Sequence, residues 1–250
     1  MPIACAVNIS AELLSFLRGA SRVVVLTGAG ASQESGLRTF RDSQIGLWAQ
    51  YRPEELASPE AFARDPKLVW DWYAWRREAL KGARPNPGHY ALAEIEKNTP
   101  EFTLITQNVD GLHRMAGSRN ILELHGNLQR VRCADCSSVA DVWDEDAEST
   151  PRCAKCGGRL RPDVVWFGES LPLDQLEKAV KATRACDLYF SIGTSGVVQP
   201  AASLARAAKS IGAILVEINA EPTPLTPAVD FFFEGKSGEI LPALAQAAWG

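Results

Sequence analysis

Short runs of apolar and β-branched residues alternate along the chain with longer segments of helical periodicity. The apolar runs end in small or polar residues and occupy residues 22–30, 102–108, 188–195, 213–219 and 230–238. The helical patterns occupy residues 10–18, 67–81, 87–97, 172–185, 200–210 and 238–248. This alternation predicts an α/β fold with a parallel sheet covered by helices on both faces. In such sheets, ligands bind beyond the carboxyl ends of the strands.

Two regions interrupt the alternation. Residues 38–84 contain helical patterns without a strong strand, and residues 129–162 contain four of the six cysteines. We interpret both regions as insertions that together form a smaller second domain. The first domain then consists of residues 1–37, 85–128 and 163–250.

The four cysteines have the spacing of a zinc site. Cys133 and Cys136 form one CxxC motif, Cys153 and Cys156 form a second, and sixteen residues lie between the two. Two such motifs about 15–20 residues apart are typical of structural zinc, because four thiolates close a tetrahedron and leave no open position. The alternative, a pair of redox-active motifs, is weaker because neither CxxC begins a helix after a strand. We therefore predict one structural Zn²⁺ in the module 129–162, beside a helical module at 38–84.

Composition and charge exclude several classes of protein. The hydrophobic fraction is 46%, the charged fraction is 22%, and 26 basic against 30 acidic residues leave a net charge of −4 without a long basic run. We therefore expect no nucleic-acid partner and no anionic membrane partner. No apolar run approaches the ~18–20 residues of a membrane span. The first residues lack the pattern of a signal peptide, so we expect a cytoplasmic protein.

The stretch VVVLTGAGAS (23–32) joins a predicted strand to Gly28-Ala29-Gly30. Glycines at this position of a parallel sheet let a dinucleotide phosphate approach the backbone, because no Cβ stands in the way. The stretch departs from the dehydrogenase fingerprint, since Gln33 replaces the third glycine and no second strand ending in an acid follows about twenty residues later. A hydride-transfer site is therefore not predicted.

Two further stretches carry polar side chains at the end of an apolar run. In TQNVDGLH (106–113), Asn108 and Asp110 are suited to hydrogen-bond an amide ligand, although turn and helix-cap chemistry explains the same residues. In ILELHGN (121–127), His125 is a candidate general base, because the pKa of histidine lies near neutral pH. His89 and His113 stand at predicted helix starts and are interpreted as structural.

The order of these motifs is recognisable. GAGAS, Phe40-Arg41, TQNVD, LHG, the four cysteines, VVWFGE (164–169), GTS (193–195) and Asn219 together resemble a sirtuin of the prokaryotic type, from about residue 20 to 245. The stretch YAWR (73–76) resembles the Tyr-x-x-Arg signature of class III sirtuins, which remove acidic acyl groups such as succinyl and malonyl. The resemblance implies a Rossmann-like NAD-binding domain and a small domain built from a zinc-ribbon module and a helical module.

The resemblance also implies the cofactor site. The residues expected around NAD are Gly28, Ala29, Gly30, Ala31, Ser32, Phe40, Arg41, Gln107, Asn108, Val109, Asp110, Gly193, Thr194, Ser195, Asn219, Ala220, Glu221 and Ser237. Of these, the glycine loop should face the phosphates, Gln107 the nicotinamide-side ribose, and Asn108 and Asp110 the nicotinamide amide.

As implied by the resemblance, the reaction transfers the acyl group of an acyl-lysine protein or peptide to ADP-ribose and releases nicotinamide. His125 should act as general base on the ribose hydroxyls. The backbone of Val165 and Phe167-Gly168 should pair with the substrate peptide as an added strand. Tyr73 and Arg76 lie three residues apart, on one helix face, and should bind the acyl carboxylate. We expect a monomer.

Three other functions would use parts of the same sequence. An NAD-dependent dehydrogenase requires the acid that is missing after the second strand. A zinc-ribbon nucleic-acid binder requires basic and aromatic residues around the cysteines, where the chain instead has the acidic stretch DVWDEDAEST (141–150). An ADP-ribosyl transferase or a non-catalytic NAD sensor would share the fold, and peptide-dependent release of nicotinamide distinguishes a deacylase from both.

Overall fold

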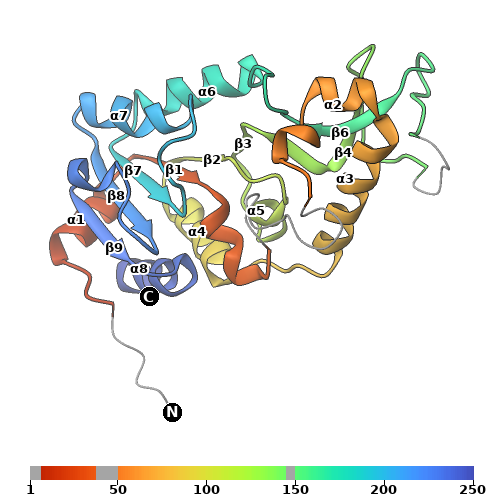
Figure 1. Ribbon diagram of the computed structural model, residues 1–250. Helices are drawn as coiled ribbons and strands as arrows, with labels where there is room; N and C mark the ends of the chain where they lie inside the picture. The colour runs from red at the N-terminus through yellow and green to blue at the C-terminus, as the bar shows by residue number, and fades with distance from the viewer. Residues whose placement is uncertain (1–6, 38–49, 145–149) are drawn as a thin grey trace.

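A six-stranded sheet of parallel strands forms the larger part of the molecule. The computed structural model describes residues 7–37, 50–144 and 150–250. The strands follow the order β3-β2-β1-β7-β8-β9 across the sheet (Figure 1). Their bounds are β1 Arg22–Thr27, β2 Glu101–Thr106, β3 Ile121–Glu123, β7 Leu188–Ile192, β8 Ile214–Asn219 and β9 Phe231–Glu234. Strand order reverses between β1 and β7, which is where a doubly wound sheet opens a crevice for a ligand.

Helices cover both faces of this sheet (Figure 1). Alternate residues of β1 point to opposite faces: Val23 and Val25 pack with α1, α4 and α8, whereas Val24 and Leu26 pack with α6 and α7. The helices are α1 Ala11–Gly19, α4 Pro87–Asn98, α6 Leu173–Thr183, α7 Ala202–Ser210 and α8 Ser237–Trp249. Burial on both faces explains why the strands are continuously apolar in the sequence.

A second, smaller body lies beside the carboxyl end of the sheet (Figure 1). It contains a three-stranded antiparallel sheet in the order β5-β4-β6 and two helices packed against it. Its elements are α2 Pro59–Arg64, α3 Pro66–Lys81, β4 Gly126–Cys133, β5 Val139–Ala140 and β6 Leu160–Val164. Short helical segments complete the chain, at α5 Leu112–Met115, η1 Ala29–Ser35, η3 Pro53–Glu55 and η4 Thr226–Ala228.

The predicted α/β fold is confirmed. Every predicted strand and helix has a counterpart within a few residues. Asn86 caps α4, with Pro87 in its first turn. The sequence pattern did not reveal β3 or the antiparallel sheet, because these strands are short or polar. Ser237 is the first residue of α8. The described helices include none long and apolar enough to cross a membrane.

Candidate functional site

Two loops meet backbone to backbone at the carboxyl edge of the large sheet. Gly30 N donates to Gly193 O at 2.9 Å, which ties the loop after β1 to the loop after β7. A Cβ on Gly30 would lie 2.7 Å from Gly193 Cα, and a Cβ on Gly193 would lie 2.3 Å from Ala31 N. Glycine is therefore required at both positions by this close approach, in addition to any contact with a phosphate.

A buried polar cluster lies below this contact. The Ser32 hydroxyl donates to Asp110 Oδ2 at 2.8 Å, and Asn108 Nδ2 donates to Ser32 Oγ at 3.1 Å and to Gly28 O at 3.0 Å. Leu112 N donates to the second carboxylate oxygen of Asp110 at 2.9 Å. Burial raises the pKa of Asp110, and these hydrogen bonds oppose that rise. The amide and acid predicted in TQNVD are thus brought together with the glycine loop.

The side-chain amide of Gln107 connects the loop after β2 to the loop after β7. Gln107 Nε2 donates to Thr194 Oγ1 at 3.0 Å, and Asn219 Nδ2 donates to Thr194 O at 2.8 Å. Val109, between Asn108 and Asp110, turns toward the small body and packs in its apolar cluster. The loops after β2, β7 and β8 therefore form one continuous polar rim.

His125 lies between β3 of the large sheet and β4 of the small sheet. Its Nδ1 lies 2.9 Å from Gln107 O. A carbonyl only accepts, so Nδ1 carries the proton and Nε2 keeps a free lone pair. Burial lowers the pKa of His125, and the hydrogen bond to Gln107 O partly opposes this. The imidazole is therefore neutral at pH 7 and able to accept a proton.

The glycine after His125 is required by the crossing of two chain segments. Gly126 has φ +79°, and a Cβ there would lie 2.1 Å from Asp163 O. Val165 N donates to His125 O at 3.0 Å, so the histidine is held against the loop after β6.

The other two histidines, His89 and His113, are buried, and His89 Nε2 also lies 3.4 Å from Ser32 Oγ of the polar cluster. His89 Nδ1 accepts from Asn86 N at 3.2 Å at the start of α4, and His113 Nε2 lies 3.0 Å from Thr27 Oγ1. Burial lowers the pKa of His89 to about 4 and that of His113 well below its ordinary value. Both rings are neutral parts of the scaffold beneath the rim.

A cavity of about 210 Å³ opens at the far end of the rim. Its lining residues come from the loops after β1, β7, β8 and β9: Gly30, Gln33, Glu34, Gly193, Ile218, Asn219, Ala220, Gly235, Lys236 and Ser237. Five of them were predicted to contact NAD. Glu34 was missed, although its carboxylate accepts from Gly238 N at 2.7 Å and thereby caps α8 in place of Ser237.

Some predicted residues lie elsewhere. Ser195 and Glu221 are exposed and do not line the cavity, and Ala29 is exposed at the start of η1. Phe40 and Arg41 lie outside the described residues.

The loop after β6 is partly exposed to solvent. Phe167 is 47% exposed, its N–H donates to Ala57 O at 2.9 Å, and Gly168 has φ +85°. Arg161 holds the base of this loop, because its guanidinium pairs with both carboxylate oxygens of Glu169 at 2.5 and 2.9 Å. Arg161 was not singled out in the sequence, since it belongs to no spacing with known chemistry, and Glu169 was named only as the last residue of VVWFGE.

Helix α3 packs beside this loop and carries the predicted Tyr-x-x-Arg pair. Tyr73 is 1% exposed, and its hydroxyl accepts a hydrogen bond from Trp166 Nε1 at 3.0 Å. The Arg76 guanidinium lies 5.6 Å from the centre of the Tyr73 ring and 5.0 Å from that of Trp72. Tyr73 and Arg76 therefore share a side of α3, and Val109 of the rim belongs to the same apolar cluster as Tyr73.

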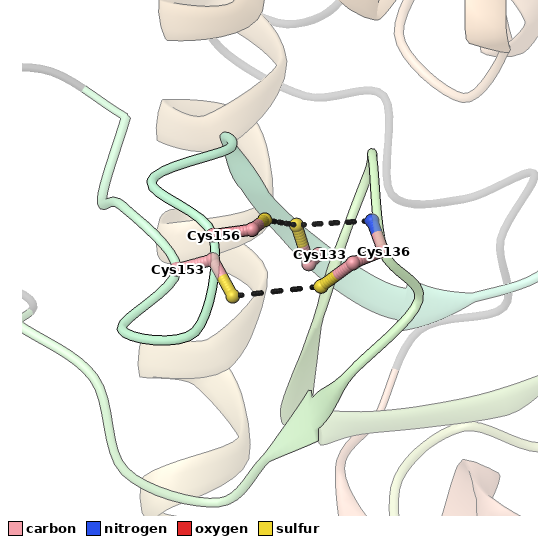
Figure 2. Close-up of side chains that lie close together, drawn as sticks. All are labelled: Cys133, Cys136, Cys153 and Cys156. Carbon is pink, nitrogen blue, oxygen red and sulfur yellow. Dashed lines mark hydrogen bonds between the residues drawn. The ribbon is translucent and has the colours of Figure 1, made fainter.

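The four predicted cysteines converge in the small body (Figure 2). Cys133, Cys136, Cys153 and Cys156 hold their Sγ atoms within 4.8 Å of one another. Asp135 N and Cys136 N point at Cys133 Sγ, at 3.4 and 3.5 Å, as backbone amides do around a thiolate. Four thiolates and no other donor fit a closed tetrahedral Zn²⁺ site, so the predicted structural zinc agrees with the geometry.

The zinc module packs directly on α3. Trp70 contacts Cys133 and Cys153, and the Arg77 guanidinium lies 4.6 Å from the ring centre of Trp70 and 5.3 Å from that of Trp143. The tryptophans of α3 thus hold the helix between the zinc module and the loop after β6.

Comparison with known proteins identifies relatives. A family model described as Sir2 family matches residues 28–200. A relative from Pyrobaculum aerophilum, named NAD-dependent protein deacylase 2, is 54% identical over 94% of this chain and 94% of its own.

Solved structures agree with this match. A Sir2 homologue in complex with NAD has 48% identity and a TM-score of 0.91, with 97% of this chain and 95% of that chain covered. A mutant Sir2 homologue in complex with 2′-O-acetyl ADP-ribose has 48% identity and a TM-score of 0.88, with 96% of each chain covered.

The cysteine cluster leads to a prediction about stability. Cys133→Ser or Cys153→Ala should lower the free energy of unfolding by about 3 kcal/mol or more, or about 6–12 °C in Tm, because zinc-binding energy is partly folding energy. Metal analysis should give about one zinc per chain in the wild type. Cys186→Ala, which removes a buried thiol outside the cluster, should keep the zinc. A zinc-free variant that melts normally yet loses turnover would contradict a structural role.

Proposed function

The chain belongs to the Sir2 family, and we propose that it is an NAD-dependent protein-lysine deacylase that removes succinyl and malonyl groups as well as acetyl groups. The relative named as a deacylase and the homologue solved with NAD support the general activity. The observation that carries the proposal is His125, a neutral base at the rim, bound through Nδ1 to Gln107 O.

The rim residues and the cavity fit a dinucleotide. Gly28, Gly30 and Ser32 lie at the start of η1, and Asn219, Ala220 and Ser237 belong to the loops around the cavity. We assign the loop to the NAD phosphates, the cavity to the adenosine half, and Asn108 and Asp110 to the nicotinamide amide. Bound NAD supplies a ribose carbon that becomes electrophilic when nicotinamide leaves.

The wider set proposed for NAD is Gly28, Ala29, Gly30, Ala31, Ser32, Phe40, Arg41, Gln107, Asn108, Val109, Asp110, Gly193, Thr194, Ser195, Asn219, Ala220, Glu221 and Ser237.

His125 is the residue that moves a proton. Its Nε2 lone pair accepts the proton of a ribose hydroxyl, so that the hydroxyl oxygen is able to attack the acyl carbon. Gln107 O accepts from Nδ1 and favours the resulting imidazolium, because a carbonyl dipole stabilises the added charge. With NAD bound, the overall transfer would consume one water, release nicotinamide and free lysine, and leave the acyl group as an ester on ADP-ribose.

The acyl-lysine peptide is proposed to pair with the loop after β6. Val165 is half-buried and Phe167 and Gly168 are exposed there, and a peptide backbone is able to add beside such a segment as a strand. The connection from Val165 N to His125 O places this loop beside the base.

The acyl preference is proposed to depend on Tyr73 and Arg76. A succinyl or malonyl carboxylate is costly to bury without partners. Arg76 offers charge-assisted donors and Tyr73 offers its hydroxyl from the same side of α3. Burial raises the pKa of Tyr73 to about 12, so the hydroxyl stays protonated. An acetyl group has no carboxylate and gains nothing from the pair.

The proposal includes a cytoplasmic monomer with acylated proteins or peptides as partners and no nucleic acid. It keeps residues 1–37, 85–128 and 163–250 as the NAD-binding domain, with modules 38–84 and 129–162 in the small domain. Nicotinamide release that requires an acylated peptide distinguishes this enzyme from an ADP-ribosyl transferase or an NAD sensor.

Removal of the proposed base gives the first test. His125→Ala should lower deacylation by ~10²–10⁴, the usual value of general-base catalysis, while Tm and zinc content stay unchanged. Retention of activity within about threefold would remove His125 from the mechanism.

The lowered pKa of His125 gives a second test. A base whose pKa lies below 6.5 stays unprotonated through neutral pH and is lost only as the pH falls through that lower value. For an acetyl-lysine peptide, kcat/KM should therefore stay level from pH 8 to about 6.5 and decline at lower pH. Circular dichroism at each pH excludes unfolding. An acid limb with its midpoint above pH 7 would contradict the assignment.

The acyl pair gives a third test. Arg76→Met should reduce kcat/KM for a succinyl-lysine peptide by about 2–4 kcal/mol in transition-state free energy, because a desolvated carboxylate loses its charged partner. Tyr73→Phe should reduce it less. Turnover of the matched acetyl-lysine peptide should change far less than that of the succinyl peptide. If both variants lowered the two activities equally, Tyr73 and Arg76 would be scaffold residues.

A further inference from the structure

A buried hydrogen bond connects the loop after β6 to α3. Trp166 Nε1 donates to the Tyr73 hydroxyl oxygen at 3.0 Å, and the two residues are 3% and 1% exposed. An indole N–H is only a donor, so the phenol oxygen is the acceptor here. The proton of Tyr73 is therefore directed away from Trp166 and is available to another acceptor.

The indole is held on three sides. Trp166 N donates to Glu169 Oε2 at 2.8 Å, which fixes its backbone. The Arg161 guanidinium lies 3.3 Å from the ring centre, and Arg161 is itself held by Glu169. The Phe62 ring lies 5.3 Å away on the α2 side. These contacts leave the N–H aimed at Tyr73.

We propose that Trp166 is a positioning residue for acyl selectivity, which fixes the direction in which the Tyr73 hydroxyl donates its hydrogen bond. The inference rests on the proposed function, because it requires that Tyr73 reads the acyl carboxylate. Trp166 does not touch the acyl group in this account and acts only through Tyr73.

The physical reason is preorganisation. A free phenol rotates its O–H between acceptors, and an incoming carboxylate must first select one rotamer. A donor already bound to the oxygen removes that freedom, and it polarises the O–H so that its hydrogen bond to an anion is stronger. A neutral acetyl group does not use the donor and is indifferent to its direction.

The test is a double-mutant cycle on Trp166→Phe and Tyr73→Phe, measured with succinyl- and acetyl-lysine versions of one peptide. Phenylalanine keeps an aromatic ring beside Arg161 but removes the N–H.

In the wild-type background, Trp166→Phe should lower succinyl kcat/KM by about 5–30-fold, mainly through KM, because the carboxylate is remote from the reacting carbonyl. Acetyl kcat/KM should change by less than about threefold. In the Tyr73→Phe background, the same substitution should change succinyl kcat/KM by less than about threefold, because no hydroxyl remains to be directed.

A second replacement guards against a packing defect. Benzothienylalanine at position 166 substitutes sulfur for the N–H with nearly the same ring shape, and it should show the same selective loss. Trp70→Phe is the matched control, since Trp70 lies on the same helix as Tyr73 but packs on the zinc module. This control should leave the ratio of succinyl to acetyl kcat/KM unchanged.

The outcomes separate the two proposals. If both Trp166 replacements lower the two activities alike, or if the loss persists in the Tyr73→Phe background, Trp166 is a packing residue and the inference is overturned while the acyl pair stands. If Arg76→Met and Tyr73→Phe leave the succinyl-to-acetyl ratio unchanged, the acyl pair itself fails, and the inference fails with it.

Discussion

The close approach of the loops after β1 and β7 is the constraint on which the site depends. Parallel strands end at one edge of the sheet, and at the reversal of strand order the two loops meet without side chains between them. Gly30 and Gly193 make that contact possible, because a Cβ on either would overlap the opposite backbone. With the loops fixed, Ser32 reaches Asp110 and Thr194 reaches Gln107, so residues from three strand ends lie together at this edge.

Helix α3 connects the zinc module with the proposed acyl site. Trp70 and Arg77 pack on the zinc module, while Tyr73, on a neighbouring stripe of the helix, bonds to the loop after β6. A metal that carries out no chemistry is thus important for the geometry of the substrate site, because it holds the surface on which α3 rests. The tryptophans of this helix pack on both neighbours, and Tyr73 lies in the same apolar cluster as Trp72 and Trp166.

Neutral buried groups recur throughout the site. Burial lowers the pKa values of His89, His113 and His125, and only His125 combines this with a half-exposed ring and a free Nε2. The three histidines differ in their partners: His89 bonds to Asn86 N and Ser32 Oγ and His113 to Thr27 Oγ1, whereas His125 bonds to Gln107 O. Position relative to the sheet edge therefore separates the proposed base from its structural neighbours.

The sequence by itself determined the strands and helices of the large domain, the zinc ligands and the glycine loop, because each is encoded in local periodicity or fixed spacing. Apolar runs such as 22–27 need no distant partner to be read as buried strands, and two CxxC motifs define a tetrahedral site wherever they fold together. The tertiary structure alone decided which long-range contacts support these motifs. Three residues act through partners distant in the chain: Trp166 at 93 positions, Arg161 at 8 and Glu34 at 204. The separations of 93 and 204 positions leave no pattern in the sequence. Gly30 and Gly193 show the same division. Their identity is visible in the sequence, but the contact that requires it exists only when the sheet brings β1 and β7 together.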